Sequence, residues 1–144
     1  MTTFAPRHVD LWPWTRTFSE VGTWTRTLSS SQLGMGQYDN ATSHAINDEV
    51  VYNVALDAGT WTLTVIGQTR STGGISTVYL DATSLGTLDL YSASITNNVV
   101  KQITGFTVSA PGVYALKFKV ESKNASASEY RFIAQLITLT RTGS

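Results

Sequence analysis

Short runs of alternating apolar and polar residues, separated by turn residues, follow one another from Asp48 to the end of the chain. Residues 49–56 and 60–66 are two such runs, and Asp57, Ala58 and Gly59 separate them. Because side chains alternate between the two faces of a strand, each run has one apolar face that must be covered. Successive short strands of this kind are typical of an antiparallel β-sandwich. The pattern therefore predicts an all-β chain and leaves little room for helices.

Alternation within the runs also predicts which side chains form the core. In three runs one face carries only large apolar residues, and these are Val50, Tyr52, Val54, Leu56, Trp61, Leu63, Val65, Tyr114, Leu116, Phe118 and Val120. Lys117 and Lys119 take the opposite face of the third run. The last run, residues 130–140, is apolar on both faces, which predicts that a second element covers it besides the core.

The number and spacing of the runs favour one kind of sandwich. About eight strands, joined by short turns and a few longer crossovers, indicate a jelly roll. An immunoglobulin-like order stays open, because strand order is not readable from the sequence. Thr72, Gly73 and Gly74 have the composition of a hairpin turn rather than of a phosphate-binding loop. The predicted fold class is an antiparallel, jelly-roll-like β-sandwich with an extended N-terminal arm.

The first 22 residues differ from the rest of the chain. They hold two of the three prolines and a series of large apolar residues, namely Phe4, Leu11, Trp12, Trp14 and Phe18. Pro13 cannot donate to a sheet and biases the residue before it toward an extended conformation. We therefore expect an aromatic arm over residues 1–22 and a sandwich domain over residues 23–144. Because burying one Trp or Phe is worth roughly 2–3 kcal/mol, the arm should pack on its own domain or, as we prefer, on a neighbouring subunit.

Composition excludes several classes of protein. The chain has 144 residues, of which 42% are hydrophobic, enough for one domain with a core. Its ten basic and ten acidic residues cancel, and no basic cluster points to nucleic acid. No apolar run is long enough to span a membrane, and the N-terminus has no signal-peptide pattern. The absence of cysteine means that stability must come from packing or oligomerisation.

Catalytic motifs are not evident in the sequence. His8 and His44 do not form a zinc-binding spacing, and no serine lies in a nucleophile elbow. Acidic residues fall mainly at turns, where Asp caps its own backbone. Oxygen ligands for a calcium ion are present at Asp39, Asn40, Asp48 and Asp89, but one sequence does not show whether they converge. We predict no catalytic residue and no cofactor, and hence a protein that is not an enzyme.

Aromatic rings are the remaining candidates for ligand binding, because sugar rings stack on aromatic faces beside polar groups. Tyr38 lies in a polar loop or short strand, and Tyr91 lies just after a predicted strand. We take both as candidate glycan-binding residues. The alternative is that they belong to the core or to an interface.

The segment from about Thr23 to Arg141 resembles a recurrent jelly-roll module of tailed-phage virion proteins. The resemblance rests on the motifs NDE (47–49), LDAGTWTL (56–63), GISTVYLD (74–81), LGTLDLYS (85–92), PGVYAL (111–116) and KNAS (123–126). This module is similar to carbohydrate-binding β-sandwich modules and is found at tail-fibre tips and in capsid decoration proteins. The resemblance implies a non-enzymatic virion protein, made in the host cytoplasm and often trimeric.

Within this resemblance, the short chain and its aromatic arm favour a capsid decoration (cement) protein that stabilises the shell. The arm would bind the major capsid protein or a neighbouring virion subunit through Phe4, Leu11, Trp12, Trp14 and Phe18. The alternative is a carbohydrate-binding receptor-recognition module of a tail fibre or baseplate. That module would bind a surface glycan through Tyr38 or Tyr91. Neither nucleic acid nor a membrane is expected as a partner.

Overall fold

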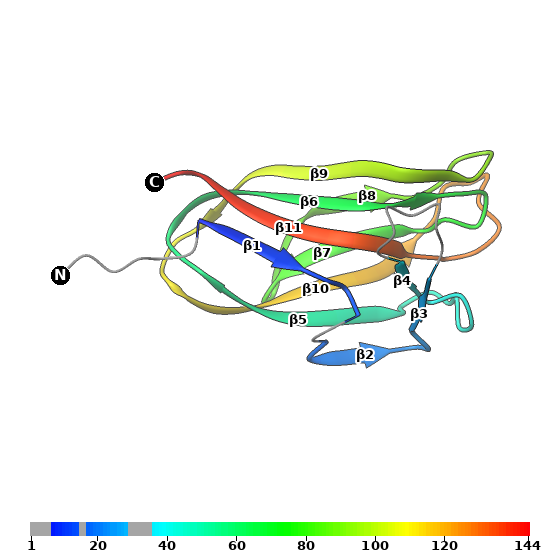
Figure 1. The fold of residues 1–144 in the computed structure, drawn as a ribbon, viewed down its shortest axis with the longest axis horizontal. Coiled ribbons are helices and arrows are strands. Elements are labelled where there is room, and N and C mark those ends of the chain that lie inside the picture. The colour runs from blue at the N-terminus through cyan, green and yellow to red at the C-terminus, as the bar shows by residue number, and fades with distance from the viewer. Residues whose placement is uncertain (1–6, 15–16, 29–35) are drawn as a thin grey trace.

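The computed structural model describes residues 7–14, 17–28 and 36–144, and over these residues the chain forms two antiparallel sheets packed face to face (Figure 1). The first sheet has the order β3 (Thr25–Thr27), β4 (Gln37–Asp39), β11 (Ile133–Gly143), β6 (Gly59–Thr69) and β9 (Thr96–Val108), and β1 (His8–Leu11) also pairs with β11. The second sheet has the order β2 (Ser19–Val21), β5 (Glu49–Leu56), β10 (Gly112–Ser122), β7 (Ile75–Leu80) and β8 (Thr83–Asp89). The described residues include no helix that could cross a membrane. The predicted all-β antiparallel sandwich is confirmed.

The core lies between the two sheets and consists of the faces that alternation predicted. The buried side chains on those faces are Val50, Tyr52, Val54, Leu56, Trp61, Leu63, Val65, Leu116, Phe118 and Val120. The ring of Phe118 lies 6.2 Å from that of Tyr52 and 5.3 Å from that of Phe132, so aromatic packing continues from the second sheet toward β11. Lys117 and Lys119 are half-buried on the other face of β10. Period-two alternation therefore identified these core residues correctly, except that Tyr114 is only half-buried and packs against the core.

The short turns that the sequence marks often carry the chain from one sheet to the other. Residues 57–58 join β5 of the second sheet to β6 of the first. Residues 70–74 carry the chain back from β6 to β7, so the prediction of a hairpin turn at Thr72–Gly74 is wrong. A true hairpin joins β7 and β8, with Asp81 in the left-handed region at a φ of 51°. Turn composition reports a local bend, whereas the partner of the next strand depends on packing.

The 13-residue strand β9 was not among the predicted strands. It forms the edge of the first sheet beside β6, and most of its side chains alternate between exposed and half-buried positions. Only Phe106 and Val108, at its end, are buried among its described residues. An edge strand that buries so little apolar surface carries a weak alternation signal.

The described part of the predicted arm packs on its own domain. β1 pairs with β11 in the first sheet, and β2 pairs with β5 in the second. Between them, the carbonyl oxygen of Pro13 accepts a 2.7 Å hydrogen bond from the hydroxyl of Tyr52. The chain therefore crosses from one sheet to the other along the side of the sandwich. Contact of the arm with a neighbouring subunit stays a prediction, carried by the side chains that this packing leaves exposed.

Three connections gather at one end of the sandwich, which we call the loop end. They are residues 70–74 between β6 and β7, residues 90–95 between β8 and β9, and residues 123–132 between β10 and β11. β1 begins and β11 ends at the opposite end (Figure 1). The loop end is therefore built from both sheets.

Candidate functional site

Backbone hydrogen bonds tie the three connections of the loop end together. Arg70 forms a parallel bridge with Tyr91, and Gly73 forms one with Arg131. The amide of Arg131 donates to the carbonyl of Thr72 over 3.0 Å, and the amide of Gly74 donates to the carbonyl of Arg131 over 2.8 Å. Loops fixed in this way hold their side chains in defined places, as a binding site requires.

Gly73 explains why the connections can approach so closely. A Cβ atom at this position would lie 1.8 Å from the carbonyl oxygen of Leu90, which belongs to the backbone of the neighbouring connection. Only glycine leaves room for such a contact. The Gly-Gly pair, which the sequence predicted to be a hairpin turn, therefore allows two loops to come into contact.

Polar side chains form a row at this end of the first sheet, in two separate hydrogen-bonded groups. Arg131 donates to Asp39 on β4 over 3.3 Å, and the side chain of Asp39 is almost fully buried. Arg70, at the end of β6, donates to the amide oxygen of Gln68 over 3.2 Å. Gln68 in turn donates to the amide oxygen of Asn97 over 2.8 Å. Burial and the nearby Arg131 lower the pKa of Arg70.

Tyr91 and Tyr130 place aromatic rings beside this row. Tyr91 is half-buried, and its amide donates to the carboxylate of Asp89 over 2.9 Å, which fixes the start of its loop. Because bridged residues project to the same side, Tyr91 and Arg70 are neighbours on the surface. The ring of Tyr130 already contacts the ammonium group of Lys123, which lies 4.9 Å from the ring centre. Tyr91 is therefore the ring better placed for a ligand.

Tyr38 does not lie on the surface, so its expected exposure is wrong. Its side chain is 8% exposed, and its ring stacks on Trp24 at 5.7 Å. The hydroxyl donates to Glu20, and burial together with this carboxylate raises the pKa of Tyr38. Although β4 lies in a polar stretch of sequence, it is an inner strand between β3 and β11, and the ring of Tyr38 belongs to the core cluster.

The possible calcium ligands Asp39, Asn40 and Asp48 lie close together, but their oxygens bind protein donors. Asp48 accepts hydrogen bonds from the side chains of Asn40 and Ser43, each over 2.7 Å. Asn40 accepts a 2.9 Å bond from the amide of Phe132. Over residues 7–14, 17–28 and 36–144, no group of three or more acidic or histidine side chains is arranged to hold a metal ion. We assign these residues to the support of the 40–48 loop.

Gln135 is a buried polar residue that the sequence gave no reason to single out. It is fully buried at the point where the pairing of β11 with β6 shifts register, and neither its amide nitrogen nor its amide oxygen has a hydrogen-bond partner. A buried amide without partners costs about 1–3 kcal/mol. The buried amide of Gln135 therefore lowers the stability of the folded chain.

Replacement of Gln135 by methionine is expected to raise the free energy of unfolding by about 1–2 kcal/mol, because the new side chain has a similar shape and no amide to satisfy. Denaturant unfolding measures the change. The matched control is Gln68→Met, which removes the two hydrogen bonds of Gln68 and should lower stability. A loss of stability in the Gln135 variant would show that its amide is satisfied in solution.

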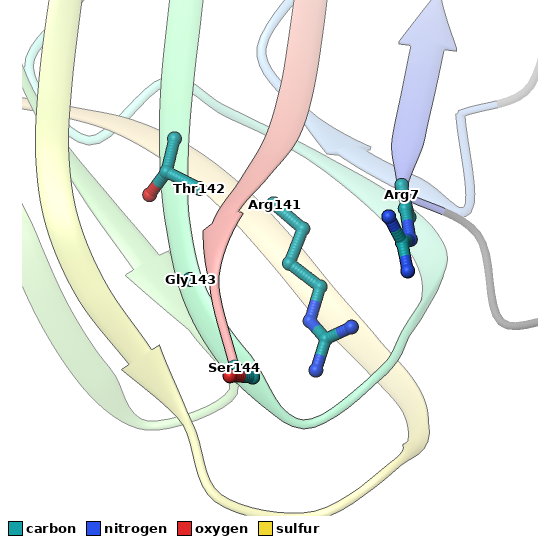
Figure 2. A pocket seen from close by; sticks show the side chains of 5 residues that line it. All are labelled: Arg7, Arg141, Thr142, Gly143 and Ser144. Atoms are coloured by element: carbon teal, nitrogen blue, oxygen red, sulfur yellow. The ribbon is translucent and has the colours of Figure 1, made fainter.

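A separate hollow of about 250 Å³ lies at the opposite end of the sandwich (Figure 2). It is lined by Arg7, Arg141, Thr142, Gly143 and Ser144. The guanidinium of Arg141 lies 3.8 Å from Asp57 and is thus partly neutralised. No aromatic ring is among these lining residues, so the hollow lacks a stacking surface. A second hollow of about 160 Å³ has Tyr114 among its lining residues, but no arginine and no amide side chain. We place the candidate site at the loop end, where a ring lies beside arginine and amide side chains.

The predicted partner-binding residues of the arm fall into two groups, apart from Phe4, which lies outside the described residues. Leu11 and Trp14 are half-buried and pack against the core of their own domain. Trp12 and Phe18 remain 40% and 69% exposed. Only the second pair presents apolar surface to another molecule.

Several solved structures of other proteins share this fold. No protein-family model and no curated protein sequence matches the chain. Among solved structures, a Paenibacillus xanthan lyase matches with a TM-score of 0.70 and 20% identity, over 88% of this chain and 12% of the lyase chain.

Two solved carbohydrate-binding modules match over nearly their whole length. The CBM36-1 domain of a multidomain xylanase from the hindgut metagenome of Trinervitermes trinervoides has a TM-score of 0.68 and 14% identity, over 95% of this chain and 99% of that chain. A family 6 carbohydrate-binding module from Clostridium cellulolyticum, in complex with xylose, has a TM-score of 0.65 and 15% identity, over 94% and 96%. The chain has the fold of these modules. At such low identity the likeness concerns the fold alone.

Sequence analysis missed the two arginines and the amide row of the loop end. Arg70 and Arg131 are 61 positions apart, and neither belongs to a motif. A signal does exist at Gly73, because adjacent glycines beside a polar segment can mark a close backbone approach. Which backbone approaches there depends on the crossover between the sheets.

Proposed function

We propose that this chain is a non-catalytic carbohydrate-binding module that binds a glycan at the loop end. The observation that carries the proposal is the position of Tyr91, half-buried and bridged to Arg70, beside the side-chain row of Gln68, Asn97 and Arg131. An aromatic face can stack on a sugar ring while amide and guanidinium groups bind its oxygens. The likeness of the fold to carbohydrate-binding modules supports this proposal.

Replacement of Tyr91 by alanine is expected to weaken glycan binding roughly tenfold, because the stacking surface is lost. The experiment applies the wild-type chain to a glycan array and then titrates the best glycan into the wild type and the variant by calorimetry. Thermal unfolding of both proteins checks that the variant is folded.

Phe18→Ala is the matched control for this experiment. Phe18 is an exposed aromatic residue on the way into β2, and its loss should leave the glycan affinity unchanged. No binding of the wild type to any glycan on the array would refute the proposed function. Equal glycan affinities of the wild type and the Tyr91 variant would show that the glycan does not stack on Tyr91 at the loop end.

A second candidate function, a virion decoration protein, is favoured by one observation. Trp12, Phe18 and Val21 remain exposed along the segment that crosses between the sheets. Exposed aromatics of this kind can anchor an extended segment on a neighbouring subunit. Light scattering on the wild type and the Phe18→Ala variant tests it, because an oligomer that depends on Phe18 would favour assembly over glycan binding.

A further inference from the structure

Two arginine side chains lie close together at the loop end, and only one of them has an acidic partner. Arg131 is paired with Asp39 at 3.3 Å. Among the described residues, no carboxylate oxygen lies within 4.0 Å of the nitrogen atoms of Arg70, and its guanidinium donates to the neutral amide oxygen of Gln68. The remaining acid nearby, Glu129, lies 3.6 Å from His44. Arg70 therefore has no carboxylate in direct contact, although Asp39 and Glu129 lie near enough to raise its pKa.

The burial of the two guanidinium groups makes this imbalance costly. The Nε atoms of Arg70 and Arg131 are buried and have no hydrogen-bond partner. Burial and Arg131 lower the pKa of Arg70, and Asp39 and Glu129, which raise it, offset only part of this effect. Removing a charge from water is unfavourable unless a counter-charge and hydrogen bonds compensate for it. An anionic ligand would supply what the described protein groups do not.

The surroundings of Arg70 indicate what kind of anion fits. Arg70 is half-buried, its Nε is buried and its Nη1 donates to Gln68, so Nη2 is the guanidinium nitrogen left for a ligand. A planar guanidinium binds a carboxylate through two parallel N–H···O bonds. Tyr91 is half-buried and its backbone is bridged to that of Arg70, so its ring is the aromatic group near enough to contact the body of the same ligand. The two features together suit a sugar ring that carries a carboxylate.

We infer that the glycan bound at the loop end is acidic, and that the carboxylate of a uronic acid residue binds the guanidinium of Arg70. This inference rests on the proposed function. Tyr91 stacks on the uronic acid ring, and Gln68 holds the arginine in position. Arg131 stays with Asp39 and contributes positive potential rather than a direct contact.

The experiment compares matched pairs of sugars on the intact chain. Oligosaccharides of glucuronate, galacturonate and mannuronate are titrated beside the neutral oligomers of glucose, galactose and mannose and beside sulfated analogues. The proteins are the wild type, Arg70→Gln, Arg70→Lys and the control Arg7→Gln. Arg7 is an exposed arginine at the opposite end of the sandwich, so its variant has the same change in net charge.

We expect the wild type to bind one uronate oligomer at least tenfold more tightly than its neutral counterpart. Arg70→Gln should reduce the uronate affinity roughly 10- to 100-fold, as expected for loss of a hydrogen bond to a charged group. Arg70→Lys should restore only part of it, because lysine lacks the planar fork. Arg7→Gln should bind like the wild type. Thermal unfolding shows which variants are folded.

Each alternative result has a distinct meaning. The inference would be overturned if the wild type and the Arg70 variants bound uronate and neutral oligomers equally well. If Tyr91→Ala then lost this binding, the proposed function would still stand. Tighter binding of the sulfated analogues would overturn the assignment of a carboxylate. If Arg70→Gln does not fold, the sugar preference of the wild type and the Arg70→Lys variant decide the question. No binding to any oligosaccharide would refute the proposed function and the inference with it.

Discussion

Replacement of Trp61 by alanine is expected to lower the free energy of unfolding by about 3–5 kcal/mol, the usual cost of removing a large aromatic side chain from a core. Trp61 is fully buried, and its indole nitrogen donates a 3.0 Å hydrogen bond to the carbonyl of Asp57 in the turn before β6. The substitution leaves a cavity between the sheets and removes this bond. Because a domain of this size is stable by only about 5–15 kcal/mol, a large part of its stability would be lost.

Denaturant unfolding of Trp61→Ala beside two further variants tests this prediction. Trp61→Phe keeps most of the ring and should cost less than Trp61→Ala. Trp12→Ala removes the same side chain from a position where it is 40% exposed, and we expect a loss on the order of 1 kcal/mol. Equal losses at Trp12 and Trp61 would contradict the assignment of the core.

Replacement of Asp48 by alanine is expected to lower the free energy of unfolding by about 2–4 kcal/mol. One carboxylate oxygen of this buried residue accepts bonds from the side chains of Asn40 and Ser43 and from the amide of Ala45. Alanine would leave all three donors without this acceptor. Because Asn40 also binds the amide of Phe132 at the start of β11, the damage should extend from the 40–48 loop into the first sheet.

Asp48→Asn and the control Asp10→Ala are measured beside Asp48→Ala. Asparagine keeps the shape but loses the charge, so we expect a smaller loss than with alanine. Asp10 has a 52% exposed side chain paired with His8, and exposed pairs contribute about 1 kcal/mol or less. Hydrogen exchange can locate the effect, with faster exchange expected at the amides of Ala45 and Phe132. Unchanged stability of Asp48→Ala would mean that the loop finds other acceptors.

The candidate site was only partly predictable from the sequence. Tyr91 was selected because it follows a strand, and the structure places it beside the polar row of the loop end. Tyr38 was selected on similar grounds and is buried, because pairing on both sides of β4 is not visible in a short polar segment. The proposed contact with an acidic sugar depends on Arg70, yet a single arginine after a strand forms no motif that the sequence would reveal. Its meaning depends on which charges lie near it in space.

The function, like the site, was only partly predictable from the sequence. A resemblance in pattern suggested a phage module that is similar to carbohydrate-binding sandwiches. The fold agrees with the carbohydrate-binding side of that resemblance, and the virion role stays a prediction. Trp12 and Phe18 are exposed and could form an interface, whereas Leu11 and Trp14 pack on their own domain.

The sequence by itself determined the fold class and the core. Alternation is a local property, since each side chain points to one face of its strand whatever the strand pairs with. Val50, Trp61 and Phe118 could therefore be assigned before any topology was known. Only the tertiary structure decided which strands pair, which turns cross between the sheets, and which charges meet at the loop end. These depend on contacts between residues far apart in the chain, such as the bridge between Gly73 and Arg131, and no local pattern encodes them.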